Sequence, residues 1–360
     1  MSDGRLLIRD LARPARLDGD DAAAFRAAAD LLTRVRRAQW GDGDHAEGLR
    51  EQYARAADTT TEHWRGWIAA DGTGEIVGLL VASLPQRENV DVAWLDLVVD
   101  PRHRRRGVGS ALLAAAERQL RTAGRTVLGG WTETPGAGPW PDALPARSGT
   151  GGVPLSAPEA AFAHRHGFAL EQVERISRLD VPLEPATLDA LEAGIPLAGY
   201  ELVAWTDRAP AGTAEDYGRL KAAMSTDIPL AELELEAEEW DAARVAEEET
   251  ELADAGGHRS VCAIRHLGTD RLVGHTVLER FDPRPDVAYQ QDTLVLAAHR
   301  GHRLGMLLKI HHLRRLATVW PDVRRIYTWN AEENTPVLDL NVELGFRQVG
   351  VVGAWQRYLT

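Results

Sequence analysis

The stretch VVDPRHRRRGVGSALL, residues 98–113, places four arginines and two glycines between an apolar run and a run with the apolar spacing of a helix. The first turn of a helix leaves backbone N–H groups unpaired and carries partial positive charge. Arginines at this position oppose the helix dipole unless an anion binds there. Glycines let a ligand approach the free N–H groups closely. The stretch therefore predicts a phosphate or pyrophosphate site at a strand-to-helix corner.

A second version of this corner, LVLAAHRGHRLGMLLK, occupies residues 294–309. Asp96 and Asp292 are 196 positions apart, and so are Gly109 and Gly305. Upstream, EIVGLLVAS at 75–83 resembles RLVGHTVLE at 271–279 with the same spacing. A constant spacing over several elements indicates an internal duplication. The sequence thus predicts two corners of one design.

Each half repeats the same order of elements, in which an opening strand leads into helices. Apolar residues at helical spacing predict helices over 20–38 and 45–57, and over 213–224 and 236–253. In each half a hairpin, a strand, the corner, a helix, a strand, a helix and a final strand follow. This order predicts an α+β fold of two tandem units, each with a mixed, mainly antiparallel sheet flanked by helices.

The boundary between the units is expected within residues 181–199, where three prolines interrupt any regular element. This gives domains at 1–182 and 183–360. After Trp131 the first half carries about twenty extra residues that have no counterpart in the second half. The segment 133–157 is rich in Gly and Pro, which predicts a long loop of the kind that forms lids or binding loops.

The composition narrows the class of protein. The chain has 54 acidic and 41 basic residues, a net charge of -13, which argues against general binding to nucleic acid or to an anionic membrane. No stretch approaches the ~18 apolar residues of a membrane span, and the start lacks a signal-peptide core. Cys262 is the single cysteine and is expected to be buried in a strand. These features favour a cytoplasmic protein.

The motif and its setting resemble the GNAT superfamily of acyl-CoA-dependent N-acyltransferases, with the signature R/Q-x-x-G-x-G/A. Arg104, Gly107 and Gly109 match this signature in the first half. In the second half Arg300 and Gly305 match, but Arg303 occupies the position of the middle glycine of the signature. The resemblance covers nearly the whole chain, and the layout is similar to that of tandem acetyltransferases such as mycothiol synthase. By contrast, no P-loop run and no G-x-G-x-x-G run is present.

The resemblance implies that acetyl-CoA is the co-substrate and that no metal is needed. The pyrophosphate would sit on the corner, the pantetheine arm would follow the preceding strand, and an Asn after the next strand would hold the arm. The residues implied for the first half are Leu97, Val98, Val99, Arg104, Arg105, Arg106, Gly107, Val108, Gly109 and Ser110. Those implied for the second half are Leu294, Val295, Leu296, Arg300, Gly301, His302, Arg303, Leu304, Gly305, Met306, Asn330 and Asn334.

For catalysis, Asp96 and Asp292 are candidates to take the proton of the acceptor amine, because most alkyl amines are protonated at pH 7. Many GNAT enzymes carry a Tyr four residues before the Gly of a G-F pair, where this chain has Ala163 and Asn341. Asn341 can donate a hydrogen bond to sulfur, which favours the second half as the catalytic one. The better glycine corner favours the first half, so both assignments stay open.

The expected function is transfer of an acetyl group from acetyl-CoA to an amine on a small molecule by a monomer or homodimer. Modification of an amino-sugar or antibiotic is an alternative within the same chemistry. A further alternative is a non-catalytic acyl-CoA-binding regulator whose two sites have degenerated.

Overall fold

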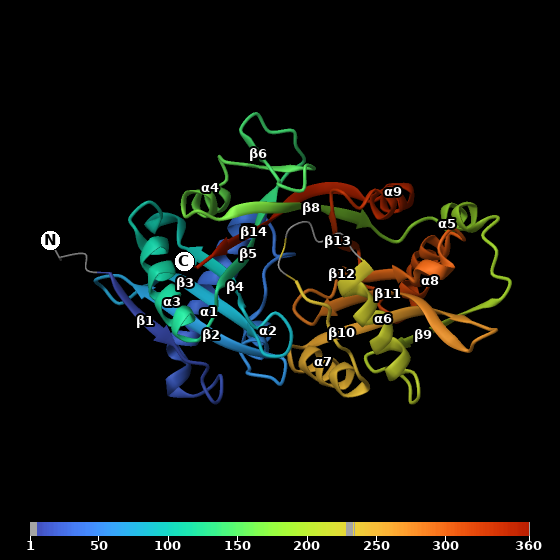
Figure 1. The fold of residues 1–360 in the computed structure, drawn as a ribbon, viewed down its shortest axis with the longest axis horizontal. Coiled ribbons are helices and arrows are strands. Elements are labelled where there is room, and N and C mark those ends of the chain that lie inside the picture. The colour runs from blue at the N-terminus through green and yellow to red at the C-terminus, as the bar shows by residue number, and fades with distance from the viewer. Residues whose placement is uncertain (1–5, 228–232, 234, 360) are drawn as a thin grey trace.

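A computed structural model describes residues 6–227, 233 and 235–359 of the chain. Twelve strands form one continuous sheet in the order β1-β2-β3-β4-β5-β14-β8-β13-β12-β11-β10-β9, with helices packed on it (Figure 1). The order has a symmetric centre, because β14 and β8 lie between two runs of five strands. The predicted α+β fold with two tandem units is confirmed.

The first half supplies the elements up to β8. They are β1 (Leu7–Leu11), α1 (Ala23–Trp40), α2 (Leu49–Arg55), β2 (Glu62–Ala70), β3 (Ile76–Pro85), β4 (Val92–Val99), α3 (Val108–Thr122), β5 (Val127–Pro135), β6 (Ala143–Pro145), β7 (Gly152–Pro154), α4 (Pro158–Arg165) and β8 (Ala169–Asp180). Helix α1 forms where the apolar spacing predicts it, and it buries Leu31 and Val35 against the sheet.

In the described residues the second half repeats this order, except that α5 (Pro185–Glu192) precedes its first strand and that it has no counterpart of the β6–β7 hairpin. Its other elements are β9 (Tyr200–Thr206), α6 (Ala214–Asp227), α7 (Ala242–Asp254), β10 (Gly257–His266), β11 (Arg271–Phe281), β12 (Val287–Val295), α8 (Leu304–Val319), β13 (Arg325–Ala331), α9 (Thr335–Leu344) and β14 (Arg347–Tyr358). Helix α7 begins six residues later than the pattern of 236–253 suggests, because Asp241 caps it by accepting from the backbone N–H of Arg244.

The two halves exchange their last strands. Strand β14 of the second half pairs with β5 of the first half, with Trp355 opposite Gly130. Strand β8 of the first half pairs with β13 of the second half, with Leu179 opposite Ile326. The two exchanged strands also pair with each other along the centre of the sheet. In Figure 1 the green β8 and the red β14 run between the two units.

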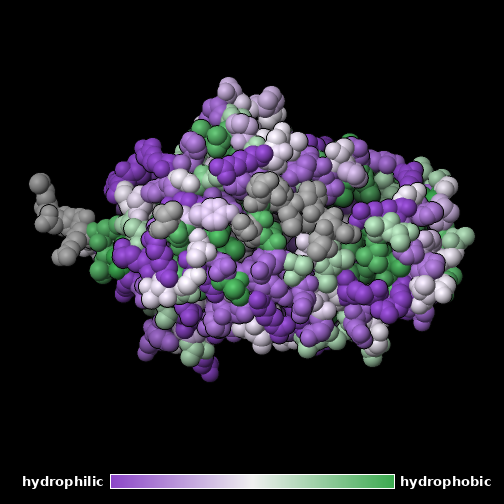
Figure 2. Space-filling model, in the orientation of Figure 1, coloured by the Kyte–Doolittle hydropathy of each residue, from purple (hydrophilic) through white to green (hydrophobic). Residues whose placement is uncertain are grey.

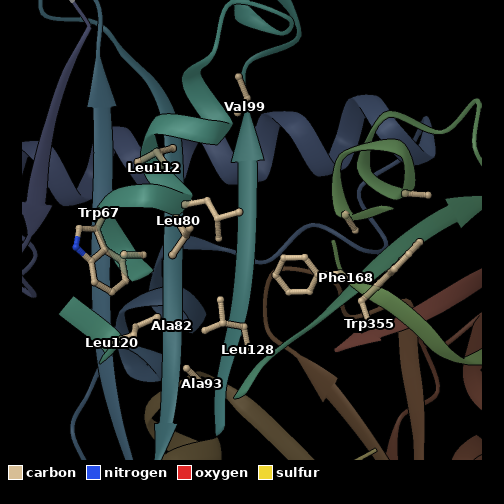
Figure 3. Packing of buried hydrophobic residues seen from close by; sticks show 14 of the residues in the cluster. Trp67, Leu80, Ala82, Ala93, Val99, Leu112, Leu120, Leu128, Phe168 and Trp355 are labelled. Carbon is tan, nitrogen blue, oxygen red and sulfur yellow. The ribbon is translucent and has the colours of Figure 1, made fainter. Parts of the chain in front are cut away.

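The exchange also builds both cores. Val351 and Trp355 of β14 are buried in the first half's main cluster. Figure 3 shows Trp355 in this cluster together with Phe168 and Leu128. Leu179 of β8 is buried in the second half's cluster. Each half therefore depends on the other for a strand and for core side chains. The boundaries 1–182 and 183–360 stay a prediction, since they fit the repeat but separate residues that fold together.

Two expectations about irregular segments are wrong. The segment 133–157 is not a loop throughout, because β5 continues to Pro135 and β6 and β7 form a hairpin. That hairpin is held by its own core contact, since Val153 is fully buried in the first half's cluster. The segment 181–199 contains helix α5, because Pro185 occupies its first turn, where a missing N–H costs no hydrogen bond.

Apolar side chains are mostly enclosed. On the face in Figure 2, hydrophilic residues dominate and hydrophobic ones appear in small separate groups. Cys262 is confirmed as a buried strand residue of β10, and burial raises the pKa of its thiol to about 12. In the part of the chain that the structure describes, the helices are too short or too polar to cross a bilayer.

The strand exchange predicts that neither half folds alone. Residues 1–182 expressed separately keep an unfilled gap between β5 and β8, and residues 183–360 keep an unpaired β14. We expect each fragment to be insoluble or to unfold without cooperativity, and the two coexpressed fragments to copurify as a complex with a cooperative transition. Circular dichroism and size exclusion measure both properties. A monomeric 1–182 fragment that unfolds cooperatively would contradict the exchange.

Candidate active site

The site begins where two parallel strands diverge. Strands β4 and β5 pair only over Val92–Leu95 and Val127–Gly130, although β4 continues to Val99 and β5 to Pro135. Beyond that point β4 stays with β3, and β5 stays with β14. The edges of β4 and β5 that face each other therefore carry unpaired backbone groups, which can bond an extended ligand.

The corner after β4 forms the wall at one end of this opening. Gly107 has φ 83°, a left-handed conformation that glycine adopts without strain, and it is the residue from which α3 starts. The side chain of Asp100 accepts from the backbone N–H and guanidinium of Arg102, which holds the pKa of that carboxyl well below its usual range. Arg104 pairs with Glu159 of α4 at 3.0 Å. Two of the four arginines thus fix the corner itself.

A cavity of about 330 Å³ occupies the opening between the strands. Its apolar wall includes Leu113 of α3, Phe162 of α4, Phe168 and Trp355. Trp355 donates through Nε1 to Oγ1 of Thr132 at 2.9 Å, so the second half's last strand forms part of the first half's cavity. The expected first-half cofactor residues on its wall are Leu97, Val98, Val99, Arg104, Arg105, Gly107, Val108, Gly109 and Ser110. Arg106 is exposed and does not line it.

Asp96 also lines the cavity, on the side of α1, but it is paired. Nη2 of Arg36 lies 2.9 Å from its Oδ1, and Asp96 raises the pKa of that buried guanidinium. The second half repeats the pairing, because Nζ of Lys221 on α6 lies 3.6 Å from Oδ2 of Asp292. The structure thus places both aspartates on equivalent strands, each beside a cation from the first long helix of its half.

Glu133 is a functional candidate that the sequence analysis did not identify. It lies on β5 two residues beyond Trp131, so both side chains point to one face of the sheet. Its Oε2 accepts from Nε1 of Trp40 at 2.8 Å, and burial raises the pKa of the carboxyl. The signal was the alternation along β5, which was lost because residues from 133 onward were assigned to a loop.

The surroundings of Glu133 are aromatic, and the nearby guanidinium of Arg36 offsets part of the effect of burial on its pKa. His45 stacks on Trp40 with ring centroids 3.8 Å apart, and burial lowers the pKa of His45 to about 4. His45 is therefore uncharged at neutral pH, although its Nδ1 lies 3.8 Å from Glu133. Trp131 stacks on Trp94 and is 46% exposed. This face offers a carboxylate with a raised pKa beside accessible indole rings.

The second corner differs from the first. Arg303 starts α8 in a left-handed conformation, φ 56°, and pairs with Glu343 of α9. Leu304 and Met306 are buried in the second half's core clusters. Three smaller cavities in the described part of the chain have no wall from residues 293–310. Neither the first-half cavity nor these three is lined by the remaining second-half residues that were expected at the cofactor, which are Leu294, Val295, Leu296, Arg300, Gly301, His302, Gly305 and Asn334.

Asn341 and Asn330 lie close together, in a chain of hydrogen bonds that starts at Lys309. Nζ of Lys309 donates to Oδ1 of Asn341 at 2.7 Å, and Nδ2 of Asn341 donates to Oδ1 of Asn330 at 2.7 Å. Burial lowers the pKa of Lys309 to about 7. Within residues 6–227, 233 and 235–359, no three His, Cys, Asp or Glu side chains are grouped as metal ligands would be.

Comparisons with known proteins show which family and which solved structures this chain is similar to. Residues 26–136 match the model of the acetyltransferase (GNAT) family. A tandem GNAT protein from the clavulanic acid biosynthesis pathway is 27% identical, with 98% of each chain covered and a TM-score of 0.74. A GCN5-related N-acetyltransferase from Sphaerobacter thermophilus shares the fold at 13% identity and a TM-score of 0.60, over 98% of this chain and 95% of its own. Among curated protein sequences none matches.

The two arginines at the end of the corner give a matched test. Arg105 lines the cavity and Arg106 does not. We expect Arg105→Ala to weaken acetyl-CoA binding about tenfold, because a hydrogen bond to a charged group contributes on the order of 1.5 kcal/mol. Arg106→Ala should change the dissociation constant less than twofold, since an exposed charge in water interacts weakly. Titration calorimetry measures both, and equal losses for the two variants would contradict the placement.

Proposed function

Because this chain is a tandem member of the GNAT superfamily, we propose that it transfers an acetyl group from acetyl-CoA to an amine on a small molecule. The reaction would take place in the first half. The observation that carries the proposal is the cavity of about 330 Å³, which joins the corner at Gly107 to the carboxylate side at Asp96. It offers one continuous path from an anion-binding end to a face where an amine can be deprotonated.

The residues of this path fit acetyl-CoA. Backbone N–H groups at the start of α3 and the side chain of Arg105 would hold the pyrophosphate. The unpaired edge of β4 at Leu97–Val99 would bond the amides of the pantetheine arm and supply an N–H to the thioester oxygen as its charge grows. Phe162, Phe168 and Trp355 would exclude water from the arm.

The acetyl group then passes from sulfur to nitrogen. The amine nitrogen bonds to the carbonyl carbon, the C–S bond breaks, and coenzyme A leaves as a thiolate that takes a proton from solvent. A thiol pKa near ~8.5 makes this leaving group tolerable without an acid at Ala163. The protonated amine must lose a proton before it attacks, and a carboxylate on the acceptor face can take this proton directly or through water.

Asp96 lines this cavity and Glu133 lines the neighbouring one, but the electrostatics of Glu133 fit the role of a base better than those of Asp96 do. The hydrogen bond from Trp40 occupies one oxygen of Glu133, and the raised pKa brings the carboxyl closer to the operating pH of a general base. Asp96 is paired with Arg36 at 2.9 Å and would hold that guanidinium in place between the two carboxylates. The acceptor would lie against Trp131 and Trp94, whose ring faces attract a cation.

A small-molecule acceptor has two supports. The related tandem GNAT protein comes from a pathway that makes clavulanic acid, a small molecule. The net charge of -13 also favours a cationic acceptor such as an amine. An amino-sugar or another amine-bearing metabolite is consistent with both the related pathway protein and the negative net charge.

A thiol-release assay with a panel of primary amines tests the function. We expect coenzyme A to be released with at least one cationic amine at a rate well above acetyl-CoA hydrolysis. The only cysteine of the chain is fully buried, so the thiol reagent should have a low protein background. Tight acetyl-CoA binding with no release across diamines, amino-sugars and amino acids would instead indicate a binding-only regulator.

A pH profile tests the base. Glu133 accepts a proton only when ionised, and burial raises its pKa, so the rate should rise with pH through that pKa and then level off. In Glu133→Gln we expect kcat to fall about 100-fold or more at neutral pH, with the loss shrinking at high pH, where free amine is abundant. The profile of kcat against pH for the best amine of the panel measures this.

Asp96→Asn is the matched comparison for that profile. If Asp96 only positions Arg36, its variant should keep the rise of rate with pH at a lower plateau. A profile in which Asp96→Asn loses the rise and Glu133→Gln keeps it would assign the base to Asp96.

A further inference from the structure

The two halves differ at the residues that face the cofactor cleft. Leu113 lines the first cavity, and the position 196 residues later is Lys309. Thr132 and Ala163 also line it, and their counterparts in the repeat are Asn330 and Asn341. The first half thus has small or apolar side chains at three positions where the second half has one lysine and two asparagines.

In the second half these three side chains bond to each other. Lys309 is 3% exposed, and its Nζ reaches across from α8 to Oδ1 of Asn341 on α9 at 2.7 Å. Asn341 is 2% exposed and reaches Oδ1 of Asn330 on β13 at 2.7 Å. The Nζ also lies 5.4 Å from the ring centroid of Phe346, the counterpart of Phe168. The bridge therefore connects α8, α9 and β13, which are the counterparts of α3, α4 and β5 around the first cavity.

A second link closes the outer end of the same cleft. Arg303 stands where the first corner has Gly107, and its guanidinium pairs with Glu343 of α9. In the first half the counterpart of Glu343 is Arg165, which lines the cavity. The carboxylate of Glu343 would repel a pyrophosphate, whereas Arg165 would attract one. Both ends of the second cleft are thus tied between α8 and α9.

We propose that the Lys309–Asn341–Asn330 bridge fills the second half's cleft in place of a cofactor, so that each chain binds one acetyl-CoA, in its first half. The inference rests on the proposed function and assigns its site to one of two similar halves. The second half then acts through β14, whose Trp355 forms part of the working cavity. Opening the bridge would leave buried polar groups unsatisfied, which disfavours a second bound molecule.

Native mass spectrometry with acetyl-CoA tests the stoichiometry on the full chain. We expect the spectrum to saturate at one acetyl-CoA per chain. Two molecules per chain would overturn the inference and leave the proposed function standing. No binding at all would instead remove the proposed function.

Hydrogen exchange locates the molecule without any substitution. On addition of acetyl-CoA we expect slower exchange in 97–113 and unchanged exchange in 294–309, the matching segment of the second half. Protection of 294–309 with none in 97–113 would overturn the assignment. The readout depends on binding alone and not on any acceptor.

A substitution that copies the second half into the first gives an independent check. Leu113→Lys places a lysine at the position equivalent to Lys309, and we expect acetyl-CoA binding to fall at least 100-fold. Ala114→Lys, which adds the same charge on the exposed face of α3 and outside the cavity lining, should bind within about threefold of the unchanged chain. Circular dichroism checks that both variants fold. A folded Leu113→Lys chain that still binds one acetyl-CoA with unchanged affinity would overturn the inference.

Discussion

Strand β14, which lies between β5 and β8, is the constraint on which the rest of the structure depends. It closes the sheet of the first half, supplies Trp355 to its core and cavity, and leaves β5 free to separate from β4 beyond Gly130. An unpaired strand edge in the middle of a sheet is costly, so the exchange with β8 binds both halves into one cooperative structure. The cavity is therefore a property of the whole chain.

The two halves share the same arrangement of strands and helices, but different side chains fill the space between the diverging strands. Both halves keep the divergent strands, a left-handed residue before the long helix, and an aspartate paired with a helix cation, Arg36 or Lys221. They differ in what fills the opening. Apolar side chains around Leu113 leave a cavity, whereas Lys309 and its two asparagine partners form hydrogen bonds across the equivalent space. A few changes in polarity at equivalent positions separate an open cleft from a closed one.

The sequence analysis found the elements that depend on local patterns. The α+β order, the two corners, their spacing and the placement of Asp96 and Asp292 on equivalent strands follow from periodicity and from the repeat. Helix α5 was missed because proline also starts helices, and Glu133 was missed because a Gly-rich segment hid the end of β5. The preference for the second half rested on Asn341, whose bonds to Lys309 and Asn330 cannot be seen in a linear pattern.

The sequence by itself determined that two similar units exist and that each has a long helix starting at an arginine-bearing corner, because turn chemistry, apolar periodicity and helix dipoles act over a few neighbouring residues. The tertiary structure alone decided which strand completes which sheet and which of the two clefts is open. Both outcomes depend on contacts between residues far apart in the chain, such as Trp355 with Thr132 and Lys309 with Asn341. Burial then set the ionisation of Glu133, since desolvation raises the pKa of its carboxyl only once the strands and α1 enclose it.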